Sequence, residues 1–190
     1  YSICEGAIKI DDLQEYSKNN KIKSLGLCDT SNLCGALEFA EKISKSGTQP
    51  IIGTQINFKI YDTIGLLPLY ALNEIGYKNI ISLSSVSYLK NDELSDPYVT
   101  IDYLLNNSKG IALFSGTVFG LFGQLFDKGK FTEIHDLYNK IKSKFGDRFY
   151  IEIQRHKDLN ENSFEKFNLK KSSDLEIPII ATNEVYYLDK

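Results

Sequence analysis

The sequence of 190 residues contains no methionine and no tryptophan. Because the chain begins at Tyr1 and has no methionine at all, we interpret it as a piece of a longer protein whose start lies upstream. It has no run approaching the roughly 18 apolar residues that span a bilayer, and it does not open with the charged and then apolar segment of a signal peptide. These absences predict a cytoplasmic protein with no membrane-bound part.

Arginine is also scarce, since only Arg148 and Arg155 among the 22 basic residues are arginine. Bidentate contacts to phosphates or bases are therefore few within this piece, and the net charge of −3 argues against a dedicated nucleic-acid surface. The content of 42% hydrophobic and 25% charged residues is that of an ordinary globular protein. The length predicts a single domain over residues 1–190.

Cysteine is rare and shows no metal-binding or disulfide pattern. Cys4, Cys28 and Cys34 are odd in number, lack CxxC spacing and have no histidine nearby. We therefore expect reduced, mostly buried thiols rather than a zinc site or a disulfide.

Apolar periodicity predicts strands and helices that alternate along the chain. The predicted strands cover residues 24–28, 51–60, 66–72, 111–114, 149–153 and 178–181. The predicted helices cover residues 13–20, 31–46, 73–89, 101–105, 121–126, 131–145 and 164–174, with a polar loop over 91–97. Asp11 or Asp12 is expected to cap the first helix, and Ser31 or Asn32 the second. This alternation predicts an α/β fold with a largely parallel sheet, either open or closed into a barrel.

The exits of the predicted strands are the natural place for a functional site, because strand-end side chains converge in parallel β/α folds. The side chains at these exits are Asp29, Thr30, Gln55, Thr117, Arg155, His156, Asn183, Glu184 and Tyr186. The alternative is that Asp29 and Thr30 serve only as turn and cap residues, which is the commoner role of such residues. A hydrolytic metal cluster needs several carboxylates and imidazoles, and this set offers few of them.

Other catalytic patterns are absent from the sequence. It has no GxSxG elbow, no Walker loop and no GxGxxG motif. The segment from Gly116 to Gly120 is too short and too apolar for a phosphate cradle, so we interpret it as a tight turn. His135 lies in a predicted helix and is expected at the surface.

Seven collinear blocks resemble the PHP (polymerase and histidinol phosphatase) domain at the amino end of bacterial DNA polymerase III alpha subunits. The blocks are Tyr1-Ser2 with Glu5-Gly6, Asp29-Thr30-Ser31-Asn32-Leu33 with Gly35-Ala36-Leu37-Glu38-Phe39, Pro50-Ile51-Ile52-Gly53, Asn73-Glu74 with Gly76-Tyr77-Lys78-Asn79, Ser115-Gly116 with Gly123-Gln124-Leu125, Phe145-Gly146-Asp147-Arg148-Phe149-Tyr150 with Glu152-Ile153-Gln154-Arg155-His156, and Pro178-Ile179-Ile180-Ala181-Thr182-Asn183-Glu184-Val185-Tyr186-Tyr187-Leu188. The resemblance covers essentially the whole chain. It implies a distorted (β/α)7 barrel, truncated at the N-terminus, so that two histidines of the family's HxH motif are expected just before Tyr1.

The resemblance also implies which positions correspond to the ligands of a trinuclear metal site. Asp29 and His156 match an aspartate and a histidine ligand, and Glu184 stands where aspartate is usual. Each of these three side chains is still able to bind a metal ion.

The other four positions depart from the family pattern. Thr30 replaces a histidine, Gln55 a glutamate, Thr117 a cysteine or histidine, and Tyr186 a histidine. Because each lost ligand typically costs 10–100-fold in metal affinity, we expect a degenerate site that holds no metal. We predict instead a hydrogen-bonded polar cluster of Asp29, Gln55, Thr117, His156 and Tyr186.

The function implied by the resemblance is that of a scaffold and docking module without catalytic residues of its own. Template-directed DNA synthesis, a nucleotidyltransferase reaction that needs Mg²⁺, is expected from downstream domains, which also contact DNA. The expected partners are the proofreading exonuclease (epsilon) subunit and other polymerase III holoenzyme subunits. The alternative is a residual metal-dependent phosphoesterase or 3′–5′ exonuclease that uses Asp29, His156 and Glu184.

Overall fold

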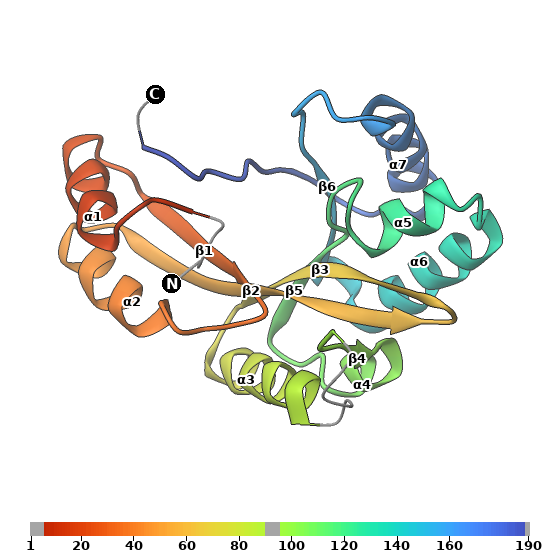
Figure 1. Cartoon of the computed structure of the whole chain (residues 1–190), viewed down its shortest axis with the longest axis horizontal. Helices are drawn as coiled ribbons and strands as arrows, with labels where there is room; N and C mark the ends of the chain where they lie inside the picture. The colour runs from red at the N-terminus through yellow and green to blue at the C-terminus, as the bar shows by residue number, and fades with distance from the viewer. Residues whose placement is uncertain (1–5, 90–95, 189–190) are drawn as a thin grey trace.

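A computed structural model describes residues 6–89 and 96–188, which form an α/β fold built on one mixed sheet (Figure 1). Within these residues the strands are β1 (Ser24–Thr30), β2 (Gln49–Ile60), β3 (Thr63–Ala71), β4 (Val99–Thr100), β5 (Ile111–Phe114), β6 (Phe149–Ile153) and β7 (Ile179–Ala181). The helices are α1 (Ile10–Asn19), α2 (Ala36–Lys45), α3 (Glu74–Leu89), α4 (Ile101–Asn106), α5 (Leu121–Asp127), α6 (Phe131–Phe145) and α7 (Glu161–Leu175), and a 3₁₀ turn covers Gly146–Arg148. None of the described helices has the length and apolar character needed to cross a membrane.

The strands lie in the order β1-β2-β3-β5-β6-β7, and β4 pairs with β2 beside this path. β1 is parallel to β2, and β6 is parallel to both β5 and β7. β3 is antiparallel to both of its neighbours, β2 and β5. A short turn at Tyr61 and Asp62 reverses the chain between β2 and β3 and makes these two strands a hairpin. The expectation of a largely parallel sheet therefore needs a correction at β3. The sheet curls from β1 towards β6 instead of lying flat (Figure 1), which confirms the predicted class of an α/β fold of the distorted-barrel type.

The two faces of the sheet differ because side chains alternate along each strand. On the outer face, Leu69, Leu113 and Phe149 are fully buried in the hydrophobic core. Helices α3, α4, α5 and α6 supply the other side of this core through Leu83, Leu104, Leu125 and Leu137. On the inner face, Tyr70 contacts Phe114 with ring centroids 4.7 Å apart, and Phe114 contacts Tyr150 at 5.5 Å.

The predicted limits of α6, β5 and β6 are confirmed, but the start of α2 is not. The sequence predicts a helix from Ser31, whereas α2 begins at Ala36. Ser31 adopts a φ of +57°, and the Asn32 side chain accepts a hydrogen bond from the Cys34 N–H at 3.0 Å. These residues form a turn before the helix, and the side chain of neither Ser31 nor Asn32 caps it.

Smaller differences concern three other elements. Asp11 and Asp12 lie inside the first turn of α1, so neither is its cap. α7 begins at Glu161, three residues before its predicted start at Phe164. The sequence did not predict the short strand β4, and most of the predicted loop 91–97 lies outside the described residues.

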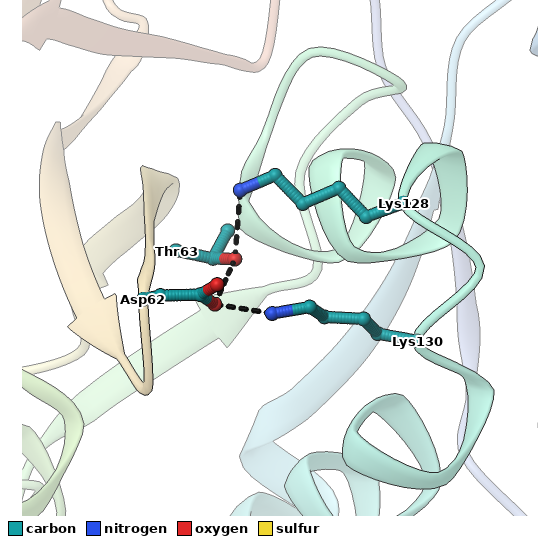
Figure 2. Close-up of polar contacts among 4 residues, drawn as sticks. All are labelled: Asp62, Thr63, Lys128 and Lys130. Carbon is teal, nitrogen blue, oxygen red and sulfur yellow. Dashed lines mark hydrogen bonds and ion pairs between the residues drawn. The ribbon is translucent and has the colours of Figure 1, made fainter.

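The tip of the β2–β3 hairpin is attached to the connection between α5 and α6. Lys130 forms an ion pair with Asp62, and the Lys128 Nζ donates a hydrogen bond to Thr63 Oγ1 at 3.0 Å (Figure 2). Thr63 Oγ1 in turn donates to the Asp62 carboxylate at 3.3 Å. The hydrogen bond from Lys130 holds the pKa of Asp62 below its usual range. These contacts join the hairpin to the helical side of the fold.

A C-terminal strap, defined as residues 182–188, leaves β7 and runs back across the molecule towards α1 (Figure 1). The Ala7 N–H donates a hydrogen bond to the Tyr186 carbonyl at 3.1 Å, so the strap lies against the start of the described chain. Near β7, the Thr182 N–H donates to the Ile153 carbonyl at 3.2 Å. The strap therefore places Glu184 and Tyr186 on the inner side of the curled sheet.

We predict that Gly65→Ala destabilises the fold. A Cβ at this position would lie 2.6 Å from Leu121 Cα and 2.7 Å from Leu121 N, which are backbone atoms at the start of α5. Separating β3 from α5 is expected to lower the free energy of unfolding by about 1–3 kcal/mol in denaturant titrations. Gly26→Ala in β1 is the matched control, because its Cβ would meet only Tyr70 Cε1 at 3.7 Å. Equal stabilities of the two variants would contradict this packing argument.

Candidate functional site

Two adjoining cavities open at the end of the sheet where the strap crosses. The first, which we call the acidic cavity, measures about 270 Å³ and is lined by Thr117, Val118, Phe119, Glu152, Ile153, Gln154, His156, Asp158, Glu161, Phe164, Glu165, Asn168, Glu184 and Tyr186. The second, the polar cavity, measures about 350 Å³ and is lined by Thr30, Gln55, Leu66, Pro68, Gly116, Thr117, Phe119, Gly120, Glu184 and Tyr186. Thr117, Phe119, Glu184 and Tyr186 form the wall that both share.

The loop after β5 supplies part of this shared wall. Gly116 adopts a φ of +78°, and a Cβ at Gly120 would lie 2.9 Å from the Leu66 carbonyl oxygen of β3. The Gly120 N–H donates to the Thr117 carbonyl at 3.0 Å, which confirms the tight turn predicted here. This turn presents Thr117 and Phe119 at the cavities, and Phe119 remains 66% exposed.

Six of the seven predicted site residues line one or both cavities. Thr30 and Gln55 line the polar cavity, and His156 lines the acidic cavity. Thr117, Glu184 and Tyr186 line both. The convergence of strand-end side chains that the sequence predicts is therefore present in the structure.

Asp29 is the exception. Alternation along β1 places it on the opposite face of the sheet from Cys28 and Thr30, and it lines neither cavity. Its side chain is largely buried, and its carbonyl accepts a hydrogen bond from Thr54 Oγ1 at 2.6 Å. The structure thus separates Asp29 from the polar cluster in which the sequence places it.

Thr117 Oγ1 accepts a hydrogen bond from the Phe119 N–H at 3.2 Å, and the other remaining predicted residues form side-chain pairs. Gln55 Nε2 donates to Thr30 Oγ1 at 2.9 Å, and Tyr186 Oη donates to Glu184 Oε2 at 2.6 Å. His156 Nε2 donates to Gln154 Oε1 at 3.1 Å. The first pair joins neighbouring parallel strands, whereas the second lies within the strap.

Glu152 is a site residue that sequence reasoning did not single out. It lies on β6 with 5% of its surface exposed and lines the acidic cavity. Its Oε1 accepts hydrogen bonds from Thr182 Oγ1 and, at 3.3 Å, from Gln154 Nε2. Its buried Oε2 has no hydrogen-bond partner among the described residues. A charged residue at an inward position of the alternating strand 149–153 was the available signal.

Burial raises the pKa of Glu152, and the nearby Glu184 carboxylate raises it further. Hydrogen bonds from Thr182 and Gln154 act in the opposite direction, because they stabilise the ionised form. The dominant cause is loss of hydration, which disfavours charge in the interior.

The segment that carries His156 is held by two acidic residues of α7. Glu161 Oε2 accepts hydrogen bonds from the backbone N–H groups of His156 at 2.7 Å and Asp158 at 3.3 Å. Arg155 forms a forked ion pair with Glu165, with its Nε and Nη2 atoms 3.0 Å and 2.7 Å from the two carboxylate oxygens. Both carboxylates are therefore engaged within the chain.

Two of the three cysteines lie in the described residues, and both are free thiols. Cys34 is exposed. Cys28 lies on the inner face near Tyr70, where burial raises the pKa of its thiol to about 12. Cys4 lies outside the described residues.

The side chains around the cavities do not fit a multinuclear metal centre. Thr30, Gln55, Thr117 and Tyr186 present neutral groups, which bind divalent cations weakly. Within residues 6–89 and 96–188, no group of three or more His, Cys, Asp or Glu side chains is arranged to hold a metal ion.

Comparison with known proteins shows which family this sequence matches. The family model described as the PHP domain matches residues 1–156. The DNA polymerase III subunit alpha of Caulobacter vibrioides is 36% identical over 98% of this chain, and that of Rickettsia felis is 34% identical over 100%. The chain spans only 17% and 16% of the lengths of these two relatives.

A solved structure from Bifidobacterium adolescentis, assigned as a metal-dependent phosphoesterase, aligns with a TM-score of 0.49 and 12% identity. The alignment covers 96% of this chain and 84% of that one. At this TM-score the likeness carries no argument about function.

We predict that Glu152→Gln changes how stability depends on pH. Because folding raises the pKa of Glu152 above its ordinary value of 4.5, the folded chain binds more protons than the unfolded chain between these two pKa values. The stability of the parent chain therefore falls as pH rises through that window, and the glutamine variant avoids this loss. The free energy of unfolding of the variant relative to the parent should rise by about 1.4 kcal/mol for each unit by which the pKa is raised.

Denaturant titrations between about pH 4 and pH 8 measure this difference. Glu41→Gln is the control, because Glu41 is exposed on α2 and the same substitution there removes no buried charge. A difference between variant and parent that stays constant with pH would contradict the assignment.

We predict that the two described thiols differ strongly in reactivity. Since the thiolate is the nucleophile, Cys28 with a pKa of about 12 should react with iodoacetamide at about pH 8 at least ~100-fold more slowly than the exposed Cys34. Peptide mass spectrometry of native and denatured chain measures both rates. Similar rates at the two positions in the native chain would show that Cys28 is not shielded.

Proposed function

Because this chain belongs to the PHP domain family, we propose that it is the amino-terminal domain of a DNA polymerase III alpha subunit and serves there as a non-catalytic scaffold and docking module. The identity of 28–36% to curated alpha subunits, over 98% or more of this chain, supports the proposal. Since the chain spans 16–17% of the length of these relatives, we assign DNA synthesis to the remaining part.

The observation that carries the scaffold role is the chemistry of the predicted ligand positions. Thr30 and Gln55 are neutral and hydrogen-bond each other at 2.9 Å across neighbouring strands. Such a bond satisfies polar groups without the charge of a metal ion. Tyr186 likewise donates to Glu184, so a carboxylate in this region already has a protein partner.

In this proposal the full-length protein is a cytoplasmic DNA-directed DNA polymerase. Its nucleotidyltransferase chemistry uses Mg²⁺ held by carboxylates outside residues 1–190. The partners are the proofreading exonuclease (epsilon) subunit, other subunits of the polymerase III holoenzyme, and DNA bound through downstream domains.

The competing function is a residual metal-dependent phosphoesterase or 3′–5′ exonuclease that uses Asp29, His156 and Glu184. These three residues do not converge, because Asp29 occupies the other face of the sheet. His156 and Glu184 share only the acidic cavity. The arrangement of these side chains therefore favours the scaffold role.

We predict that the full-length protein, purified without chelator, retains close to zero manganese or zinc per chain. Elemental mass spectrometry measures this ratio, and Asp29→Ala is the matched variant that should leave it unchanged. Two or three tightly held ions, or loss of phosphoesterase activity in Asp29→Ala, would overturn the scaffold proposal in favour of the competing enzyme.

Docking is tested separately with the exonuclease subunit. Deleting residues 1–190 from the full-length chain should weaken its affinity for that subunit by at least about tenfold in sedimentation or calorimetry. Unchanged affinity would contradict the docking role, because the contact would then lie elsewhere in the chain.

A further inference from the structure

The acidic cavity concentrates carboxyl groups, and Arg155 pairs with one of them, Glu165. Five of its lining residues carry carboxyl groups, namely Glu152, Asp158, Glu161, Glu165 and Glu184. Among the described residues, none of those lining the cavity is lysine or arginine. Like charges gathered in a concave site attract a cationic group, because the surrounding protein screens them less than water does.

The hydrogen bonds and ion pairs identify the carboxylates that a ligand would meet. Glu161 is engaged by backbone N–H groups, and Glu165 is engaged by Arg155. Glu152, although 95% buried, has an Oε2 atom that lacks a donor within the described chain. Glu184 is exposed and accepts a hydrogen bond from Tyr186 alone among the donors identified in the described residues. Asp158 bonds to Glu161 through its backbone, so Glu152, Asp158 and Glu184 are the carboxylates that remain for a cation to bind, and of these Glu152 is the buried one.

The residues that line the cavity favour an organic cation over a metal ion. In the described parts of the chain, no three His, Cys, Asp or Glu side chains are arranged so that they could hold a metal ion. The cavity does contain the rings of Phe119, Phe164 and Tyr186, and aromatic faces attract guanidinium groups. A guanidinium also has five N–H donors in a planar fork, which suits two separate carboxylates.

We propose that the acidic cavity binds the guanidinium group of an arginine side chain inserted by a protein partner. The Arg155–Glu165 pair is an internal precedent, because a carboxylate that lines this cavity already holds a guanidinium in the forked geometry. Glu184 binds the entering group from the strap, and Glu152 supplies the buried acceptor. The proposal rests on the docking role inferred above, since it names the group that a docked partner inserts.

The test is calorimetric titration of the full-length chain with N-acetyl-arginine amide. The control ligand is N-acetyl-citrulline amide, which has nearly the same shape but no charge. Saturable binding of the arginine compound, with at least about tenfold weaker binding of the citrulline compound, is expected. Equal binding of the two, or no binding of either, would overturn the proposal.

Variants locate the binding to the acidic cavity. Glu184→Gln is expected to weaken the binding of N-acetyl-arginine amide by about three- to tenfold. Because Glu184 is exposed, this substitution should leave the fold intact. Glu152→Gln should weaken the binding of the arginine compound at least as much, whereas Glu41→Gln on α2 should leave this affinity unchanged. Wild-type affinity in the Glu184→Gln and Glu152→Gln variants would place the binding elsewhere and refute the proposal.

Two further measurements separate the possible failures. Manganese that binds more tightly than the arginine compound and depends on Glu184 would show that the cavity holds metal, against this inference. If the exonuclease subunit still binds the full-length chain when the arginine compound does not, the docking role stands and only the arginine site is wrong. If the full-length chain binds neither the arginine compound nor the exonuclease subunit, the docking role is contradicted as well.

Discussion

Antiparallel pairing of β3 with both β2 and β5 decides which side chains meet in this molecule. Since a shift of register by one residue would exchange the two faces of a strand, this pairing sends Leu69 to the hydrophobic core and Tyr70 to the inner face. The pairing of β5 with β3 and β6 puts Phe114 and Tyr150 on the same inner face, and alternation along β6 puts Glu152 there too. The side chains on the inner face are therefore determined by which side chains of the same strands are buried in the core.

The sequence predicts elements well where breakers mark their ends and poorly where tertiary contacts set them. Gly110 and Gly146 bound β5 and α6, so these limits could be read from the chain. The delayed start of α2 depends on the left-handed conformation of Ser31, which no propensity signals for serine. The direction of β3 depends on its partner strands, and periodicity alone carries no information about partners.

The candidate site was predictable as a location but only partly as a set of contacts. Thr30, Gln55 and Thr117 do reach the cavities, because strand ends meet at one edge of the sheet. The sequence predicts that the first strand ends at Cys28, which would put Asp29 at its exit. In the structure β1 continues through Thr30, so Asp29 lies within the strand and faces the other side of the sheet. Glu152 escaped prediction because a buried, incompletely bonded carboxylate is exceptional, and sequence patterns assign charge to the surface.

The C-terminal strap contributes to the wall that the two cavities share. Residues 183–187 are exposed, yet Glu184 and Tyr186 form a wall of both cavities. A segment with little buried apolar surface opens at a lower free energy than the core beneath it. Amide hydrogen exchange in the strap is therefore expected to be faster than in β5 or β6. Because Glu184 and Tyr186 belong to the strap, any change in the strap alters the lining of both cavities at once.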